Sequence, residues 1–322
     1  MSLVDATAGD SNSLNNQGSD VVVNRIRGVS PVLATPFTAQ GAVDKRGYAR
    51  VVDYVLETGV SSLLLFGLAG ESYKLDEDER RELLRTLVER ARGVDVTIIA
   101  SVTDHSTEVA LRRAREWIGS GANAINVLPP SFLNPSTESI ETHLETIMDA
   151  LDAPVICQLA PNETGRALEP SVLARLANEY PNFRVAKVES QPPGETIAAL
   201  RDESHGQLKS IVGYAGLSWP DAVRAGAIGV QPSCSFTELY VRGQAALDSG
   251  DAPGFERMHG QLLPFLTDWM ASVERLIGVD KQILWRRGLI ESPTCRRPGH
   301  TLATGDIARI DQFLTLLAEA TR

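Results

Sequence analysis

The sequence predicts an α/β fold, a (β/α)8 TIM barrel followed by a C-terminal helical extension. Eight short runs rich in Val, Ile and Leu alternate with longer amphipathic segments between residues 29 and 234. Nearly continuous apolar content is typical of parallel strands buried on both faces. Eight β–α units in succession indicate a closed barrel. After residue 234 the pattern is all helical, which predicts the extension.

The expected strands and helices alternate along the chain. The strands are expected at 29–37, 61–67, 96–102, 124–130, 154–161, 183–190, 208–213 and 227–233, and the helices at 44–58, from Asp76 onward, and at 106–119, 136–151, 170–180, 193–204 and 216–225. Glu79 follows Asp76 at the spacing of a capping box. A doubly wound sheet is the alternative, but it requires a GxGxxG turn after the first strand, where this chain reads LATPFTAQG.

The predicted organisation has three parts. Residues 1–25 are rich in Ser, Asn, Asp and Gly and predict a disordered N-terminal arm. Residues 26–234 form the barrel core. Residues 235–322 supply the eighth barrel helix and the helical extension, with helices expected at 235–249, 252–273, 278–288 and 303–320.

Composition limits the possible partners and compartment. A net charge of −10 and a pI near 5.1 argue against binding to nucleic acid or to an anionic membrane surface. No apolar run is long enough to cross a membrane. Cys157, Cys234 and Cys295 are far apart, which predicts reduced thiols in a cytoplasmic protein. No His, Cys and Asp spacing suggests a metal site.

Active sites of such barrels lie at the carboxyl ends of the strands, where the only lysine is Lys187 in FRVAKVES (183–190). Burial lowers the pKa of an ammonium group and makes the amine a nucleophile toward a carbonyl carbon. A protonated imine then accepts electrons, as making or breaking a carbon–carbon bond beside a ketone requires. Alternatively, Lys187 pairs with Glu189, which shares its strand face, or reaches out to solvent.

Several motifs carry a resemblance to a known family: VLATPF, GLAGES, PSFLNPS, APNETG and VAKVES, in this order, with GDAPGFERMHGQLLPFL in the helical tail. From about residue 27 to 320 the chain resembles the dihydrodipicolinate synthase / N-acetylneuraminate lyase family of class I aldolases. The resemblance implies Schiff-base chemistry on pyruvate or a related 2-oxo acid, without a metal or organic cofactor. It also implies a homo-oligomer, usually a tetramer of two tight dimers. Lys187 falls at the family's Schiff-base lysine.

The chain departs from this family at the residues expected to move protons. Leu68 and Ala69 stand where the family has two hydroxyl residues after strand 2. Gln158 replaces the catalytic tyrosine and has no ionisable proton. Phe132 replaces a second tyrosine, which the synthases lend across the dimer interface. Glu163 replaces the arginine that binds the second substrate's carboxylate.

These departures shape the predicted site. Lys187 is the expected nucleophile, and Tyr214, directly after strand 7, is the first candidate for a new proton donor. Tyr73, His105 and Glu163 are further candidates, although each also has an ordinary structural explanation. The expected substrate-binding residues are Gly67, Leu68, Ala69, Gln158, Glu163 and Gln231, with Phe132 at an interface near the site.

Two functions remain open from the sequence. One is a class I lyase that forms an imine between Lys187 and a small 2-oxo acid, followed by aldol cleavage, condensation or dehydration of an unidentified substrate. The missing hydroxyl groups argue against an ordinary dihydrodipicolinate synthase, and Glu163 would repel an anionic aldehyde and favour a polyol or a cationic group. The other is a catalytically silent paralogue that binds a small metabolite.

Overall fold

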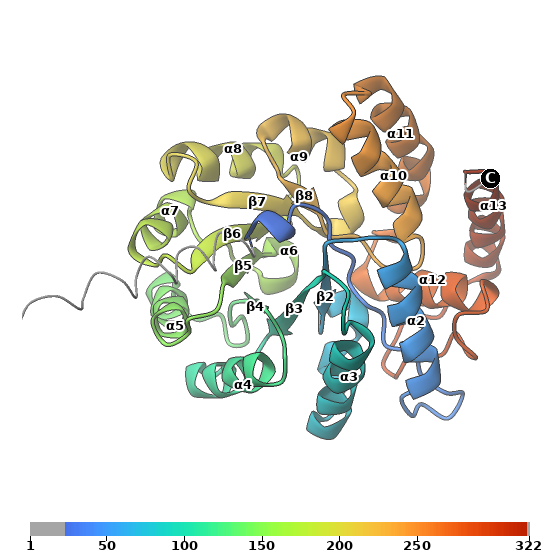
Figure 1. The fold of residues 1–322 in the computed structure, drawn as a ribbon, viewed down its shortest axis with the longest axis horizontal. Coiled ribbons are helices and arrows are strands. Elements are labelled where there is room, and N and C mark those ends of the chain that lie inside the picture. The colour runs from blue at the N-terminus through green and yellow to red at the C-terminus, as the bar shows by residue number, and fades with distance from the viewer. Residues whose placement is uncertain (1–22, 321–322) are drawn as a thin grey trace, which may run out of the picture.

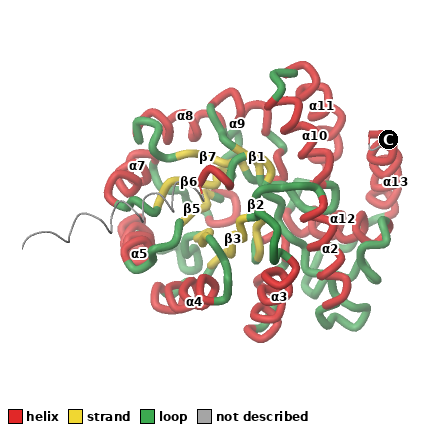
Figure 2. The backbone as a smooth tube through the Cα atoms, in the orientation of Figure 1, coloured by secondary structure: helices red, strands yellow, loops and turns green. Residues whose placement is uncertain are grey.

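The computed structural model describes residues 23–320 as eight parallel strands surrounded by helices (Figures 1 and 2). The strands are hydrogen-bonded in the order β1-β8-β7-β6-β5-β4-β3-β2. Single bridges from Val32 to Leu64 and to Ser233 bring the two edges together. The predicted (β/α)8 barrel is confirmed. The strands are β1 (Gly28–Val29), β2 (Ser62–Leu65), β3 (Thr97–Val102), β4 (Ala124–Val127), β5 (Val155–Leu159), β6 (Phe183–Val188), β7 (Lys209–Val212) and β8 (Gly229–Val230).

Helices follow the strands in the expected order. The barrel helices are α2 (Lys45–Glu57), α3 (Glu77–Arg90), α4 (Thr107–Gly119), α5 (Thr137–Asp149), α7 (Pro170–Glu179), α8 (Gly194–Glu203), α9 (Trp219–Ala225) and α10 (Thr237–Asp248). The C-terminal helices are α11 (Ala252–Trp269), α12 (Val273–Arg286) and α13 (Thr304–Ala320), which lie to one side of the barrel (Figure 1). Short helical turns follow three strands: η1 (Leu68–Gly70) after β2, α6 (Pro161–Thr164) after β5 and η3 (Tyr214–Gly216) after β7. A fourth, η2 (Ser72–Lys74), precedes α3.

Several elements differ from the sequence prediction. The first strand was expected at 29–37 but regular pairing ends at Val29, because Pro31 has no N–H to donate to a ladder. The expected helices 252–273 and 278–288 are separated earlier, at residues 270–272, where Ser272 caps α12 by accepting a hydrogen bond from the N–H of Arg275. The short helix α6 was expected to be part of a loop.

Most of the predicted N-terminal arm, 1–25, lies outside the described residues. Its last three residues, 23–25, are helical, and Val23 packs against the inside of the barrel. In the part of the chain that the structure describes, no helix combines the length and apolarity needed to cross a membrane.

The barrel interior is filled by one apolar layer, to which most strands contribute a residue. Its members are Ile26, Val32, Leu64, Ile99, Ala124, Ile156, Val185 and Ile211. Because strand side chains alternate between faces, the residue two positions further along each strand also points inward, nearer the carboxyl end. For β3 to β6 these next residues are Ser101, Asn126, Gln158 and Lys187. A polar layer therefore lies directly on the apolar one.

Candidate active site

A chain of hydrogen bonds joins the polar side chains across four adjacent strands. The Nδ2 group of Asn126 donates to Ser101 Oγ at 3.1 Å and to Gln158 Oε1 at 2.9 Å. Gln158 Nε2 in turn donates to Glu189 Oε2 at 2.6 Å. All four side chains are buried. Because Gln158 Oε1 accepts the hydrogen bond from Asn126, the amide nitrogen of Gln158 is directed toward Glu189.

Lys187 lies at the end of this series of hydrogen bonds, and it is only 4% exposed. Its Nζ lies 3.4 Å from Glu189 Oε1, so the pairing that the sequence left open is present. The same carboxylate oxygen accepts a hydrogen bond from the backbone N–H of Tyr214 at 3.2 Å. Among the described residues, the amine thus has one ion-pair partner, Glu189, and it lines the pocket above it.

A pocket opens over the Lys187 amine. Its charged lining residues are Glu163, Lys187 and Glu189. Its other lining residues are Val32, Leu68, Ala69, Gln158, Tyr214, Ala215, Gln231, Pro232, Ser233, Met270, Val273 and Leu276. Seven of the residues singled out from the sequence therefore line one pocket, together with apolar side chains from α12 and from the turn before it.

The electrostatics of the pocket are dominated by its two carboxylates. Burial raises the pKa of the Glu163 carboxyl, and the nearby Glu189 raises it further, against a smaller opposing effect of Lys187. Like charges close together resist joint ionisation. A cation or a hydrogen-bond donor entering the pocket would relieve this repulsion, whereas an anion placed beside Glu163 would increase it.

Tyr214 lies at the pocket in an unusual backbone conformation. Its φ is 55°, and Ala215 follows with a φ of 53°. Such left-handed residues are strained and cluster at functional sites. The Tyr214 hydroxyl accepts a long hydrogen bond from Asn162 Nδ2 at 3.5 Å, so it points toward α6.

Four of the residues named from the sequence lie away from this pocket. Tyr73 is half-exposed and its hydroxyl donates to Glu274, and His105 Nδ1 accepts from the N–H groups of Ser131 and Phe132. Gly67 instead packs against Val32, where an added Cβ would lie 2.6 Å from Cγ1. Phe132 is 71% exposed at the tip of the β4–α5 loop. Tyr73 and His105 therefore have the structural explanations that the sequence left open.

Comparison with known proteins identifies the family. The sequence profile of the Dihydrodipicolinate synthetase family matches residues 25–315. The chain belongs to this family. The matched range includes every strand and every residue of the pocket, so the predicted resemblance is confirmed.

Individual members of the family are moderately similar in sequence. The 4-hydroxy-tetrahydrodipicolinate synthase of Methanopyrus kandleri is 31% identical over 243 residues, covering 74% of this chain and 80% of that protein. The match to the synthase of Salinibacter ruber, 33% identical, spans 48% of this chain and 51% of that protein. The crystal structure of the Thermotoga maritima dihydrodipicolinate synthase superposes with a TM-score of 0.83 at 25% identity, over 91% of this chain and 99% of that one.

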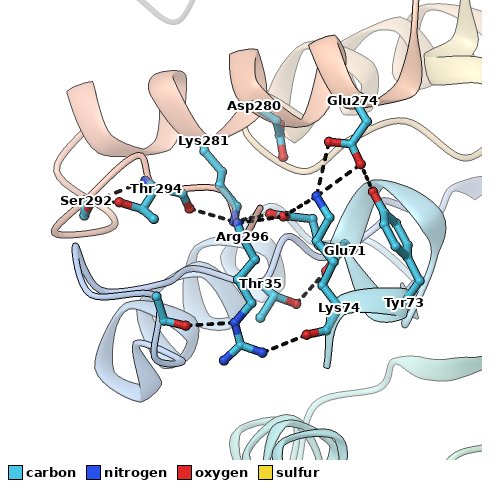
Figure 3. Close-up of polar contacts among 12 residues, drawn as sticks. Thr35, Glu71, Tyr73, Lys74, Glu274, Asp280, Lys281, Ser292, Thr294 and Arg296 are labelled. Carbon is cyan, nitrogen blue, oxygen red and sulfur yellow. Dashed lines mark hydrogen bonds and ion pairs between the residues drawn. The ribbon is translucent and has the colours of Figure 1, made fainter. Parts of the chain in front are cut away.

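A second buried lysine, missed by the sequence analysis, fixes the turn after β2 (Figure 3). Lys281 on α12 is only 1% exposed and forms an ion pair with Glu71 of the GLAGES turn. Its Nζ also donates to the carbonyl of Thr294 at 2.9 Å and lies 4.0 Å from the centre of the Phe37 ring. Lys74 Nζ approaches the second oxygen of Glu71 at 3.0 Å. Lys281 has these partners and does not line the pocket above Lys187.

Cys157 and Cys234 are buried thiols. Cys157 points away from the barrel interior, as expected from Gln158, and burial raises the pKa of its thiol to about 12. Cys234 is also buried. Among the described residues, no group of three or more His, Cys, Asp and Glu side chains is placed to hold a metal ion.

Proposed function

We propose that this chain is a Schiff-base lyase that forms an imine between Lys187 and pyruvate or a related 2-oxo acid. The observation that carries this proposal is the Lys187 amine, nearly buried at the base of the barrel-mouth pocket. Family membership supports it, because the lysine lies at the position that the resemblance assigns to the Schiff base. The reaction is an aldol cleavage, condensation or dehydration, and it needs no metal or organic cofactor, since the imine itself accepts the electrons.

The composition of the pocket favours a substrate that carries hydroxyl groups beyond its 2-oxo acid portion. Glu163 and Glu189 supply acceptor oxygens, and Gln231 Oε1 is buried without a hydrogen-bond partner in the part of the chain described. A buried acceptor without a partner costs free energy, so a ligand that donates a hydrogen bond to it is bound more tightly. The backbone N–H groups of the Leu68–Ala69 turn bind the carboxylate. On this proposal, the chain shares its family with the relatives named 4-hydroxy-tetrahydrodipicolinate synthase but takes a different partner for the 2-oxo acid.

Borohydride reduction in the presence of pyruvate and other 2-oxo acids tests the imine. We expect mass spectrometry to locate an irreversible adduct on the peptide that contains Lys187. Lys187→Arg keeps the charge but removes the nucleophile, and it should abolish the adduct. Lys209→Arg is the matched control, because Lys209 is exposed at the start of the neighbouring strand β7. An adduct on Lys281, or none with any acid tested, would contradict the proposal.

A catalytically silent, metabolite-binding paralogue is the second candidate. The ion pair between Lys187 and Glu189 favours it, because the pair explains a buried lysine without any chemistry. On this alternative, a 2-oxo acid raises the melting temperature equally in the wild type and in Lys187→Ala, and borohydride traps nothing.

We further propose a cytoplasmic homo-oligomer, a dimer or tetramer, with Phe132 at the contact. Phe132 and Leu133 are 71% and 87% exposed at the tip of the β4–α5 loop, next to each other. Exposed adjacent apolar side chains are typical of an interaction surface. Phe132→Ser should lower the mass measured by sedimentation velocity toward that of the monomer, and Leu263→Ser, at a 40% exposed position on α11, should not. A wild type that sediments as a monomer would contradict this.

A further inference from the structure

Glu189 occupies a position from which it can exchange protons with the reactive amine. It follows β6, two residues after Lys187, and its Oε1 is 3.4 Å from Lys187 Nζ. Proton transfer needs a contact of about 2.6–3.2 Å, and such contacts are often longer in unliganded sites. The hydroxyl of Tyr214, by contrast, is directed toward Asn162 on α6. Glu189 is the acid–base group that contacts the amine directly.

The surrounding residues hold this carboxylate in one place. Gln158 Nε2 donates to its Oε2 at 2.6 Å, and the backbone N–H of Tyr214 donates to its Oε1 at 3.2 Å. The side chain lies over the backbone of Gly213, where an added Cβ would be only 2.2 Å from Oε1. A buried carboxylate with two donors and a glycine that makes room for it has a defined orientation. Gln158, which replaces the family's tyrosine, thus has a positioning role.

We propose that Glu189 is the catalytic acid–base residue for imine formation on Lys187, in place of a phenol. This proposal rests on the imine chemistry proposed above. The Glu189 carboxylate first takes a proton from the ammonium group. The neutral amine adds to C2 of the 2-oxo acid, a C–N bond forms as the C–O π bond breaks, and the oxygen takes the proton from Glu189. The product is a carbinolamine with a positively charged nitrogen.

A second proton follows the same path. Glu189 removes it from the nitrogen of the carbinolamine and delivers it to the hydroxyl group. Water leaves as the nitrogen lone pair forms the C=N bond. Two protons have then moved from nitrogen to oxygen, one water has been released, and Glu189 is again a carboxylate beside a protonated imine. No further reactant is needed.

The charges around Glu189 are compatible with this role. Lys187 faces it from the same strand and Glu163 from α6, and the pocket side chains from the α11–α12 region are the apolar Met270, Val273 and Leu276. Glu189 therefore has one cation, Lys187, with which it can exchange protons, and one anionic neighbour, Glu163. The apolar side chains of the pocket limit the access of water, which would otherwise compete for the protons of Glu189 and Lys187.

The rate of imine formation tests this role without knowledge of the full substrate. The protein is mixed with pyruvate, quenched with borohydride after set times, and the fraction of Lys187 modified is measured by mass spectrometry. Glu189→Gln should slow the approach to the adduct by about 100-fold or more, the lower end of the range for loss of a general acid–base group. Adduct should still accumulate after long incubation, because Lys187 remains. Glu195→Gln, at an exposed position on α8, is the matched control and should have the wild-type rate.

The outcomes separate the two proposals. A wild-type adduct that forms equally fast in Glu189→Gln overturns the role of Glu189 and leaves the imine proposal standing. No adduct in the wild type with any 2-oxo acid overturns both. If Glu189→Gln lacks a cooperative melt, Glu189→Ala with added formate replaces it. A slow rate that formate raises supports proton transfer by the carboxylate, and a slow rate that formate does not raise counts against it.

Discussion

Glu71→Gln is expected to lower the free energy of unfolding by about 3–5 kcal/mol, the range for removing one charged partner of a buried ion pair. Glu71 is fully buried, and its two oxygens contact Lys281 and Lys74. It also accepts a hydrogen bond from the backbone N–H of Arg296 at 3.1 Å. The glutamine keeps the shape of the side chain but leaves the Lys281 ammonium buried without its anion. Figure 3 shows that these contacts join the turn after β2 to α12 and to the chain beyond it.

Urea unfolding followed by circular dichroism measures this change. Glu82→Gln is the matched control, because Glu82 pairs with Lys45 at 2.6 Å on the surface, where such pairs contribute about 0–1 kcal/mol. Replacing both partners, by Glu71→Leu with Lys281→Met, should recover much of the loss, since no charge is then left unpaired. A loss below about 1 kcal/mol in Glu71→Gln would show that water reaches Lys281.

The effect of Glu71→Gln should also depend on pH. Burial lowers the pKa of Lys281, and Glu71 opposes that shift. With a folded pKa below the unfolded value of about 10.4, the cost of the buried ammonium is present at low pH. It disappears as pH rises from the folded pKa toward the unfolded one. Losing Glu71 lowers the folded pKa further, so the difference between wild type and variant should shrink as pH rises toward the unfolded pKa of about 10.4.

Much of the fold and the position of the nucleophile followed from the sequence because the signals are local. Apolar runs alternating with amphipathic segments predict the β–α order, and the period of two places Gln158 and Lys187 on the inner face of adjacent strands. In the structure these two residues are direct neighbours in the β5–β6 register. Family motifs added the expectation of chemistry. The same period would also have predicted Asn126, had it been applied to β4.

The residues that the sequence analysis missed depend on contacts between distant segments. Glu71 and Lys281 meet only because α12 packs beside the turn after β2, and a single lysine in a helix carries no sign of its partner. Strand ends were also overextended, because apolar residues continue past the last ladder hydrogen bond, as at Pro31. The contact between Gly213 and Glu189 could not be predicted from the sequence, because it depends on how the ends of β6 and β7 lie in space.

Gly213→Ala is expected to slow imine formation on Lys187 by about 10- to 100-fold, approaching the effect of losing the acid–base group. An added Cβ would lie 2.2, 2.5 and 2.7 Å from Oε1, Cγ and Cδ of Glu189. The added Cβ and the Glu189 side chain cannot occupy the same space, so the side chain of Glu189 must move. Its contacts with Lys187 and Gln158 are then lost. The overpacking should cost about 1–3 kcal/mol of stability.

The timed borohydride experiment measures the rate, and Gly260→Ala in α11 is the control. Nothing lies within 4 Å of a Cβ added at Gly260, so that variant should keep the wild-type rate and gain about 0.5–1 kcal/mol from helix propensity. If Gly213→Ala acts by displacing Glu189, its effect and that of Glu189→Gln are not additive, because both remove the same contact. The double variant should then form the imine no more slowly than Glu189→Gln alone. A further slowing in the double variant would mean that Gly213 affects Lys187 by another route.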